Sequence, residues 1–422
     1  MDQFEKKVME KAVLVGLNSD VFTREETASE ASLDELEALL ETAGGFCTGK
    51  ILQNRHTPDS HSFIGEGKAQ EVRMLVEATA STMVVFDNEL SPGNIRALEE
   101  IIGVTVLDRS ALILDIFAQR ARTREGRLQV ELAQYKYLLP RLTGMWTHLE
   151  RQEGAMGTRG PGETQLETDK RLIRKRITRL EEELREVRKV RATQRERRIK
   201  NSVPVAAIVG YTNAGKSTLL NLLTGAGIPA NNRLFDTLDT TTRQLEVSDT
   251  LTVLISDTVG FISKLPHHLV EAFKATLEEL QYADVLLHVI DAADPERDDH
   301  IRVVEKLITQ LTEDKLTVIS CYNKCDLIEP EFLPRGENVV YISAALNRGI
   351  GDLLKLIEKN LARGLHHVTF LLPYAMGGQV EKLHETAKVI KCEYEAEGIR
   401  LEAVCDEETF GRLRQYVAEE HG

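Results

Sequence analysis

One octapeptide, Gly210-Tyr211-Thr212-Asn213-Ala214-Gly215-Lys216-Ser217, follows directly on the apolar run 205–209. A strand, a glycine-rich turn and a Lys-Ser pair at a helix start predict a phosphate-binding loop, because the N–H groups of such a turn converge on one anionic site. We expect Lys216 to reach the β- and γ-phosphates of a nucleotide and the Ser217 hydroxyl to bind Mg²⁺. The predicted contacts comprise the whole octapeptide and Thr218.

A second motif, Asp257-Thr258-Val259-Gly260, comes after the strand-like run 251–256. Because Asp257 ends that strand, its carboxylate can hold magnesium through water, while Gly260 allows backbone to approach the γ-phosphate closely. We therefore predict that all four residues line the nucleotide site. The predicted metal site includes Ser217 and Asp257.

Two further motifs suit a guanine base. Asn323-Lys324-Cys325-Asp326 follows the apolar run 316–321, and Ser343-Ala344 follows the run 339–342. Asp326 can accept two N–H bonds from the guanine edge, and a buried carboxylate left unpaired would reject adenine. A backbone amide of Ser343-Ala344 can meet the guanine carbonyl oxygen. The predicted base-side residues are Asn323, Lys324, Asp326, Ser343 and Ala344.

The four motifs in this order resemble the GTPase set of P-loop proteins, in which hydrolysis depends on charge stabilisation and on positioning of water. We assign charge stabilisation to Lys216 and the magnesium ion, and we place Gly260 at the γ-phosphate. A switch threonine should complete the magnesium shell. Thr241 is assigned by resemblance to sequences that read Asp-x-Thr, whereas composition alone leaves Thr240 and Thr242 as alternatives.

The residue after Gly260 is Phe261, where Ras-like switches have a glutamine that orients the attacking water. An aromatic ring cannot hydrogen-bond water strongly, so we expect slow intrinsic hydrolysis. Asn213 has two interpretations. Related GTPases with asparagine at this position use it to coordinate potassium, but asparagine also stabilises turns. The first interpretation adds potassium to GTP and Mg²⁺ as a cofactor and predicts faster hydrolysis in potassium than in sodium.

The amino-terminal half of the 422-residue chain divides into two predicted domains. Residues 1–122 alternate between strand-like and helix-like segments, which predicts an α/β domain with a small parallel sheet. One of its helices should begin at an N-cap Ser32, with Glu35 three residues later. Residues 123–200 carry two heptad seams around a glycine-rich tip at 154–163, which predicts an antiparallel coiled-coil hairpin. The seams are Leu128, Leu132, Tyr135, Leu139 and Leu142 on the first arm and Ile173, Ile177, Leu180, Leu184 and Val187 on the second. Pro140 should kink or shorten the first arm.

The carboxyl-terminal half also divides into two predicted domains. Residues 201–363 hold the four motifs and predict a P-loop GTPase domain, a doubly wound α/β fold with a mostly parallel sheet. Residues 364–422 predict a small α+β domain with a helix from about residue 378 to residue 391.

Charge is distributed unevenly along the chain. The net charge is −14, but residues 170–200 contain 14 Lys and Arg against 5 Asp and Glu, which leaves about −23 on the rest. An acidic body with one concentrated basic helix is typical of a protein that uses a single element to contact nucleic-acid phosphates. The alternative is a solvated helix face of mixed charge.

Composition also limits the location of the protein. No stretch approaches the ~18–20 apolar residues of a membrane span, and the charged start MDQFEKKVMEK has no apolar signal region. We expect a cytoplasmic monomer, with peripheral association with a membrane as the alternative location. The five scattered cysteines predict thiols in a reducing compartment, without a disulfide or metal framework.

Longer stretches of the chain resemble the HflX branch of the Obg-HflX GTPases. They are Asp257-Thr258-Val259-Gly260-Phe261-Ile262 with Leu265-Pro266-His267, Gly160-Pro161-Gly162-Glu163-Thr164-Gln165-Leu166-Glu167 with the arginine-rich helix after it, and Gly65-Glu66-Gly67-Lys68. The resemblance covers nearly the whole chain and implies a GTPase that binds the large ribosomal subunit, with its rRNA and ribosomal proteins. It further implies that the glycine-rich tip approaches the peptidyl-transferase region and that stalled or idle ribosomes are split under stress.

Family members have also been proposed to bind ATP through the amino-terminal domain, but Gly65-Glu66-Gly67-Lys68 lacks a full phosphate-loop pattern. Two other functions fit the residues. One is an assembly factor for the large ribosomal subunit. The other is a regulatory GTPase switch whose coiled coil binds a protein effector without RNA.

Overall fold

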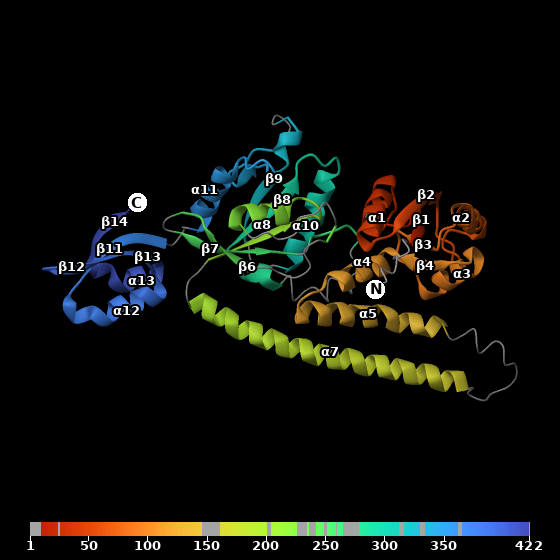
Figure 1. Ribbon diagram of the computed structural model, residues 1–422, viewed down its shortest axis with the longest axis horizontal. Coiled ribbons are helices and arrows are strands. Elements are labelled where there is room, and N and C mark those ends of the chain that lie inside the picture. Colours follow the sequence, from red (N-terminus) through yellow and green to blue (C-terminus); the bar gives the residue numbers. More distant parts are fainter. Residues whose placement is uncertain are drawn as a thin grey trace, which may run out of the picture. The chain divides into compact units, whose positions relative to one another are not determined.

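The computed structural model describes residues 10–23, 26–145, 161–200, 204–225, 234–235, 242–248, 251–258, 260–264, 278–311, 316–329, 334–361 and 365–421 (Figure 1). Its contacts divide the chain into two compact units. The first unit comprises Met1–Arg185, Asn231–Leu238 and Ser263–Phe273. The second comprises Glu186–Ala230, Asp239–Ile262 and Lys274–Gly422. Two short segments from the GTPase region of the sequence therefore belong to the first unit.

The first unit contains a four-stranded parallel sheet in the order β2-β1-β3-β4. Its strands are β1 (Lys11–Ser19), β2 (Phe46–Arg55), β3 (Met83–Phe86) and β4 (Thr105–Asp108). Its helices are α1 (Glu30–Ala43), α2 (Glu66–Thr79), α3 (Pro92–Ile102) and α4 (Arg109–Arg120). Strands and helices alternate along the chain, as the sequence predicts, because each parallel connection needs a crossover. The apolar core between strands and helices includes Val13, Val15, Val84 and Phe86.

The predicted start of α1 is wrong by three residues. Ser29 is the N-cap, and its hydroxyl accepts a hydrogen bond from the Ser32 amide while the Ser32 hydroxyl accepts one from the Ser29 amide. Two serines thus satisfy each other's amides in a capping box, a role that serine fills less often than glutamate at the third position. Glu35 is left to pair with Arg109.

Two long helices complete this part of the chain. Helix α5 (Arg124–Met145) and helix α7 (Pro161–Lys200) run antiparallel (Figure 1). Leu128, Leu132, Leu180 and Leu184 of the predicted seams are buried. Ion pairs Arg176–Glu131, at 2.6 Å, and Lys136–Glu181, at 2.9 Å, bridge the two helices. Pro140 lies inside α5, which continues to Met145, so the predicted shortening does not occur.

The second unit contains a six-stranded sheet in the order β10-β9-β8-β5-β7-β6. The strands are β5 (Val205–Gly210), β6 (Thr242–Glu246), β7 (Thr252–Asp257), β8 (Val285–Asp291), β9 (Thr317–Asn323) and β10 (Val339–Tyr341). Helix α8 (Lys216–Thr224) follows β5, α10 (Arg297–Leu311) connects β8 to β9, and α11 (Ile350–Leu361) follows β10. Among the six described strands of this sheet, only β6 is antiparallel to its neighbour. This is the predicted α/β fold, and its core includes Ile208, Val253, Leu287 and Ile319.

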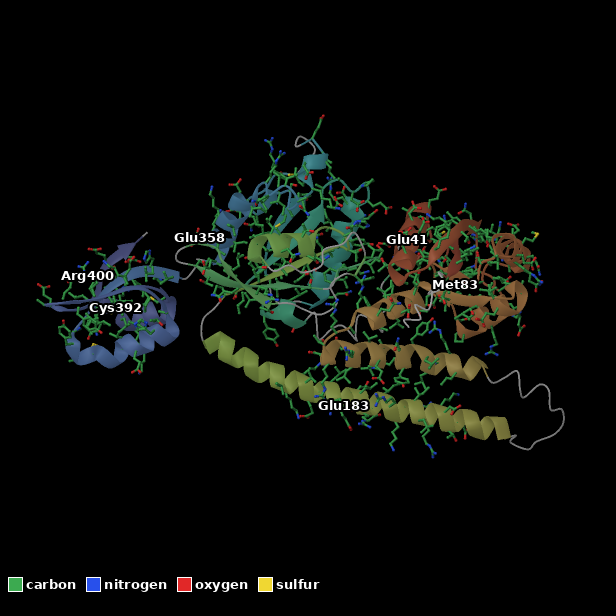
Figure 2. The ribbon with its side chains drawn as sticks, in the orientation of Figure 1. Glu41, Met83, Glu183, Glu358, Cys392 and Arg400 are labelled. Atoms are coloured by element: carbon green, nitrogen blue, oxygen red, sulfur yellow. The ribbon has the colours of Figure 1, made fainter. Side chains whose placement is uncertain are left out.

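The last part of the chain forms an antiparallel sheet in the order β12-β13-β11-β14. It contains β11 (Leu365–Leu372), α12 (Gly377–Thr386), β12 (Lys388–Glu395), β13 (Gly398–Asp406), α13 (Glu407–Leu413) and β14 (Val417–His421). Cys392 and Arg400 mark the paired strands β12 and β13 in Figure 2. The predicted helix 378–391 is wrong in its last turn, because Lys388, the β-branched Val389 and Lys391 pair with β13 instead.

Across the described part of the chain, no helix is both long and apolar enough to cross a membrane.

Candidate nucleotide-binding site

The predicted phosphate loop connects the end of β5 to the start of α8. The strand order reverses beside β5, because β7 lies on one side of it and β8 on the other. Ligands of open α/β sheets bind in the crevice at the carboxyl ends of the strands at such a switch point. The loop amides and the amino terminus of α8 therefore lie where an anion is favoured.

Two glycines of the loop occupy positions that a side chain would obstruct. Gly210 has φ 155°, and a Cβ atom there would lie 2.2 Å from the Val289 carbonyl oxygen. Gly215 has φ 94°, and its Cβ would lie 2.2 Å from Asn323 Nδ2. Asn213 has φ 59° and is exposed. Asparagine tolerates this left-handed conformation better than most residues, which fits the turn interpretation of Asn213.

Lys216 is buried beside the loop. Its Nζ donates a 2.7 Å hydrogen bond to the Tyr211 carbonyl oxygen. Burial lowers the pKa of Lys216 to about 8, and the negative charge of Asp257 opposes that shift. The ammonium group is therefore held in a site of low solvation, where a phosphate would be a better partner than a carbonyl oxygen.

The hydroxyl of Ser217 and the carboxylate of Asp257 meet at the start of α8. Ser217 Oγ donates to Asp257 Oδ2 at 3.2 Å, and Asp257 is fully buried at the end of β7. Thr258 Oγ1 donates to the Ile208 carbonyl oxygen at 2.7 Å, which fixes this strand end against β5. Thr212 Oγ1 is buried and has no hydrogen-bond partner among the described residues. The Ser217 hydroxyl and the Asp257 carboxylate together offer the hard oxygen ligands that Mg²⁺ prefers.

The segment after Asp257 returns to the phosphate loop. Phe261 donates its backbone N–H to the Gly210 oxygen at 3.1 Å and accepts from the Thr212 N–H at 2.7 Å. A Cβ atom on Gly260 would lie 2.9 Å from Thr212 Cγ2 and 3.0 Å from Lys216 Nζ. Gly260 is thus next to the lysine, and the Phe261 ring is buried. The buried ring provides no hydrogen-bonding group for water, as the sequence indicates.

Asn323 connects the phosphate loop to the predicted base site. Its Nδ2 donates to the Ala214 oxygen at 2.8 Å, and its Oδ1 accepts from the Ala344 N–H at 3.0 Å. Lys324 lies at φ 61° and pairs with Asp291 at 2.6 Å. One side chain at the end of β9 therefore orders two loops that are far apart in sequence.

The other base-side residues have less constrained surroundings. Asp326 is exposed in the 3₁₀ helix η2 (Cys325–Leu327). Its carboxylate can therefore reject adenine in the predicted way only if the bound base itself buries the carboxylate. The Ser343 amide donates to the Arg348 oxygen at 3.0 Å, and the Ala344 amide donates to Asn323. A guanine carbonyl oxygen bound here would have to share these amide donors with the Arg348 oxygen and Asn323 Oδ1.

Several predicted residues lie outside the described part of the chain. They are Thr240, Thr241, Val259 and the tip residues 154–160. The alternative switch threonine, Thr242, is the first residue of β6. The structure thus brings together the phosphate loop, Asp257, Gly260 and the Asn323 loop, while the assignment of Thr241 stays a prediction.

Two histidines near the site were not found from the sequence. The ring of His300 on α10 stacks on Tyr211 with centroids 3.6 Å apart, and its Nδ1 lies 2.8 Å from Asp294 Oδ2. His288 on β8 is buried. Its burial and, to a smaller extent, the positive charge of Lys216 lower the pKa of His288 to about 4. His288 is therefore neutral near pH 7 and leaves Lys216 as the cation of the pair. Neither histidine belongs to a motif, so no sequence signal marked them.

A strand, a phosphate loop and a helix at the switch point, followed by the Asp257 strand and the Asn323 loop, define a P-loop GTPase. Comparisons with known families agree. The family described as "GTP-binding GTPase N-terminal" matches residues 30–118, "GTP-binding GTPase Middle Region" matches residues 120–198, and "50S ribosome-binding GTPase" matches residues 205–324.

Relatives named GTPase HflX match over nearly the whole chain. The protein of Caldanaerobacter subterraneus subsp. tengcongensis is 47% identical over 97% of this chain and 94% of its own length. That of Escherichia coli K12 is 44% identical over 92% of each chain. A solved structure of SsGBP with GDP is 24% identical over 84% of this chain and 99% of its own, with a TM-score of 0.49. The chain belongs to the HflX family of GTPases, and it hydrolyses GTP to GDP and phosphate.

Proposed function

We propose that this GTPase binds the large ribosomal subunit through the basic face of α7 and splits stalled or idle ribosomes into subunits. The observation that carries the proposal is an exposed row of cations on one helix. GTP hydrolysis would then release the factor from the subunit. The description "50S ribosome-binding GTPase" of the matching family supports the same partner.

The basic face consists of exposed residues whose charged groups form no ion pair with any described residue. They are Arg171, Arg174, Lys175, Arg185 and Arg188. Some other cations of α7 are paired within the protein, such as Arg179 with Glu183 at 2.9 Å. Unpaired arginines on a rigid helix suit phosphate binding, because the guanidinium group needs little reorganisation to contact phosphate oxygens.

In the nucleotide site we assign magnesium to Ser217 and Asp257, together with Thr241. Magnesium would supply positive charge for the oxygens of the transferred phosphoryl group. Lys216 would bind the same phosphates, and a Cβ atom at position 260 would crowd Thr212 and Lys216. Potassium at Asn213 is a separate proposal, and GTP hydrolysis measured in potassium against sodium tests it.

A sedimentation experiment tests the proposed function. Intact ribosomes are mixed with the protein and a non-hydrolysable GTP analogue and are then separated on a sucrose gradient. We expect subunits to accumulate and the protein to migrate with the large subunit. Intact ribosomes that persist at saturating protein would contradict splitting.

The same gradient distinguishes the two alternatives. A protein that migrates only with immature large subunits would indicate an assembly factor. A protein partner retained after nuclease treatment, without ribosomal RNA, would indicate a regulatory switch with a protein effector. Rising salt adds a second criterion, since phosphate contacts weaken as salt increases.

A further inference from the structure

The first turn of α10 carries an aromatic contact that reaches the phosphate loop. The His300 ring lies flat against the Tyr211 ring, with centroids 3.6 Å apart and an interplanar angle of 11°. Tyr211 is 7% exposed and the His300 side chain is 18% exposed, so the contact is largely buried. Tyr211 is the second residue of the phosphate loop. A side chain of α10 therefore packs directly on the loop that is predicted to bind phosphate.

The backbone of Tyr211 is held in place as well. Its carbonyl oxygen accepts from Lys216 Nζ at 2.7 Å. On either side of this residue, the Gly210 oxygen and the Thr212 N–H both bond to the backbone of Phe261. The position of Tyr211 therefore determines where the buried ammonium group of Lys216 is directed.

A carboxylate orients the His300 ring. His300 Nδ1 lies 2.8 Å from Asp294 Oδ2, and Asp294 Oδ1 accepts from the Glu296 amide at 2.9 Å. Burial raises the pKa of Asp294, but hydrogen bonds from His300 and the Glu296 amide outweigh burial and hold this pKa below its usual value. Asp294 is therefore ionised near neutral pH and can only accept, so His300 Nδ1 carries a proton. This bond at the edge of the ring leaves its flat side for Tyr211.

The connection from β8 to α10 is also tied to the predicted base-binding motif. This connection comprises residues 292–296. The Ala292 N–H donates to the Asn323 oxygen at 2.9 Å, which anchors the start of the connection. Asp291, at the end of β8, pairs with Lys324 at 2.6 Å. The β8–α10 connection therefore meets the base-binding motif at its start and the phosphate loop, through the stacked ring, just after its end.

We propose that His300 is a positioning residue for nucleotide binding: its ring fixes Tyr211, and the β8–α10 connection thereby aligns the phosphate loop with the base-binding motif. A guanine nucleotide must contact both parts at once, so alignment in advance lowers the ordering cost of binding. GDP and GTP share the base and the β-phosphate. The ring should therefore favour both nucleotides alike. This role concerns the nucleotide site alone and is independent of the ribosomal partner.

GTP hydrolysis and GDP titration by the full-length protein test this role. His300→Ala removes the ring and should raise the KM for GTP and the Kd for GDP by a similar factor of about 2- to 10-fold, the range that one aromatic pair allows. The kcat should change by less than this factor, because an interaction lost equally from the bound and the reacting states alters KM alone.

Two further substitutions at the same position separate the flat ring from simple filling of space. His300→Phe keeps a flat ring and should restore most of the affinity for GDP. His300→Leu fills a similar volume without a flat ring, so it should bind GDP as weakly as His300→Ala. The comparison of phenylalanine with leucine also keeps the test decisive if the alanine variant does not fold.

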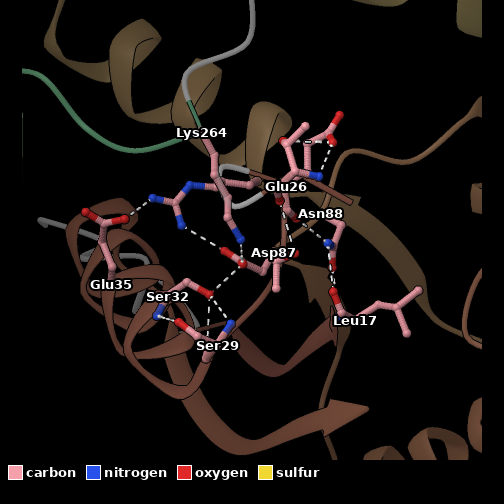
Figure 3. Close-up of polar contacts among 11 residues, drawn as sticks. Leu17, Glu26, Ser29, Ser32, Glu35, Asp87, Asn88 and Lys264 are labelled. Atoms are coloured by element: carbon pink, nitrogen blue, oxygen red, sulfur yellow. Dashed lines mark hydrogen bonds and ion pairs between the residues drawn. The ribbon is translucent and has the colours of Figure 1, made fainter. Parts of the chain in front are cut away.

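Two control variants separate this role from a general loss of stability. His366→Ala is the matched control, because the His366 ring stacks on Phe410 with centroids 3.9 Å apart and pairs with a carboxylate of β14. Asn88→Ala removes hydrogen bonds inside the first unit, in which Asn88 accepts from the Leu17 amide and donates to the oxygens of Leu17 and Glu26 (Figure 3). Both controls should lower the free energy of unfolding without changing the Kd for GDP.

Three results would overturn the proposal. One is unchanged GDP affinity in a folded His300→Ala or His300→Leu variant. Another is equal GDP affinity in His300→Phe and His300→Leu, because the flat ring would then have no effect. The third is a fall in kcat with an unchanged KM, since His300 would then act in the hydrolysis step and not in binding.

Discussion

Replacing Asn323 by alanine tests whether one side chain orders both loops of the nucleotide site. Asn323 is 3% exposed and donates to the Ala214 oxygen at 2.8 Å while accepting from the Ala344 amide at 3.0 Å. Alanine removes both bonds but keeps the backbone bond between the Asn323 oxygen and the Ala292 amide. The Ala214 oxygen and the Ala344 N–H are then left without their partner.

The magnitude follows from those two groups. A buried polar group left unsatisfied costs about 1–3 kcal/mol. Because Gly215 beside the side chain is half-buried, water can reach part of the space, so we expect the free energy of unfolding to fall by about 2–4 kcal/mol. Affinity for GDP should fall at least about tenfold, which corresponds to about 1.4 kcal/mol, because the loops lose their common anchor.

The assay is titration of a fluorescent GDP analogue together with denaturant unfolding. Asn360→Ala is the matched control, since Asn360 Nδ2 donates to the Leu356 oxygen at 2.9 Å and Asn338 Oδ1 at 3.2 Å. Asn360 lies on α11 and contributes to neither loop. The control should lose about 1 kcal/mol of stability and no affinity. Equal GDP affinity for Asn323→Ala and Asn360→Ala would refute the role of the anchor.

Three other predictions concern the phosphate side. The pKa of Lys216 is about 8 in the free protein, and bound phosphates favour its charged form. Affinity for GTP should therefore be constant below pH 8 and fall by up to about tenfold per pH unit above it. A titration of a fluorescent GTP analogue from pH 7 to pH 9.5 measures this, and constant affinity above pH 8 would contradict the prediction. Gly260→Ala should lower GTP turnover at least about tenfold while the protein stays folded, because its Cβ would lie 2.9 Å from Thr212 Cγ2 and 3.0 Å from Lys216 Nζ; unchanged phosphate release would show that the loop moves aside. If Asn213 coordinates potassium, phosphate release should be faster in potassium than in sodium chloride, and equal rates would leave Asn213 with its turn role alone.

The local parts of the site could be predicted from the sequence. The phosphate loop, the Asp257 strand end and the Asn323 loop each follow an apolar run directly, so their places at the carboxyl ends of strands follow from the order of elements. The fold class was predicted for the same reason, since alternating strands and helices require a parallel sheet with crossovers. Membership of the HflX family was likewise recognised from the motifs and is confirmed by the relatives.

Contacts between distant segments could not be predicted. The Asn323 bridge to Ala214 joins residues 109 positions apart, and the Lys264 contact with Asp87 joins residues 177 positions apart. The periodicity of apolar residues and the spacing of motifs carry no information on such pairs.

Competition between local alternatives explains the smaller errors in the predicted helix bounds. Ser29 and Ser32 are both plausible caps, and pairing with β13 decides that residues 388–391 form a strand.

Neutralising the basic face of α7 tests the proposed function most directly. The variant replaces Arg171, Arg174, Arg185 and Arg188 by glutamine, which keeps helix propensity. The matched control replaces four exposed cations elsewhere, Arg73, Arg302, Lys355 and Lys359. Co-sedimentation with large ribosomal subunits is measured over a range of salt concentrations with GTP turnover as the check on folding.

We expect the α7 variant to hydrolyse GTP still but to lose co-sedimentation, with a salt slope reduced by about one for each phosphate contact removed. The control variant should bind subunits like the unchanged protein. Full co-sedimentation of the α7 variant, with an unchanged salt slope, would contradict the proposal that this helix binds ribosomal RNA.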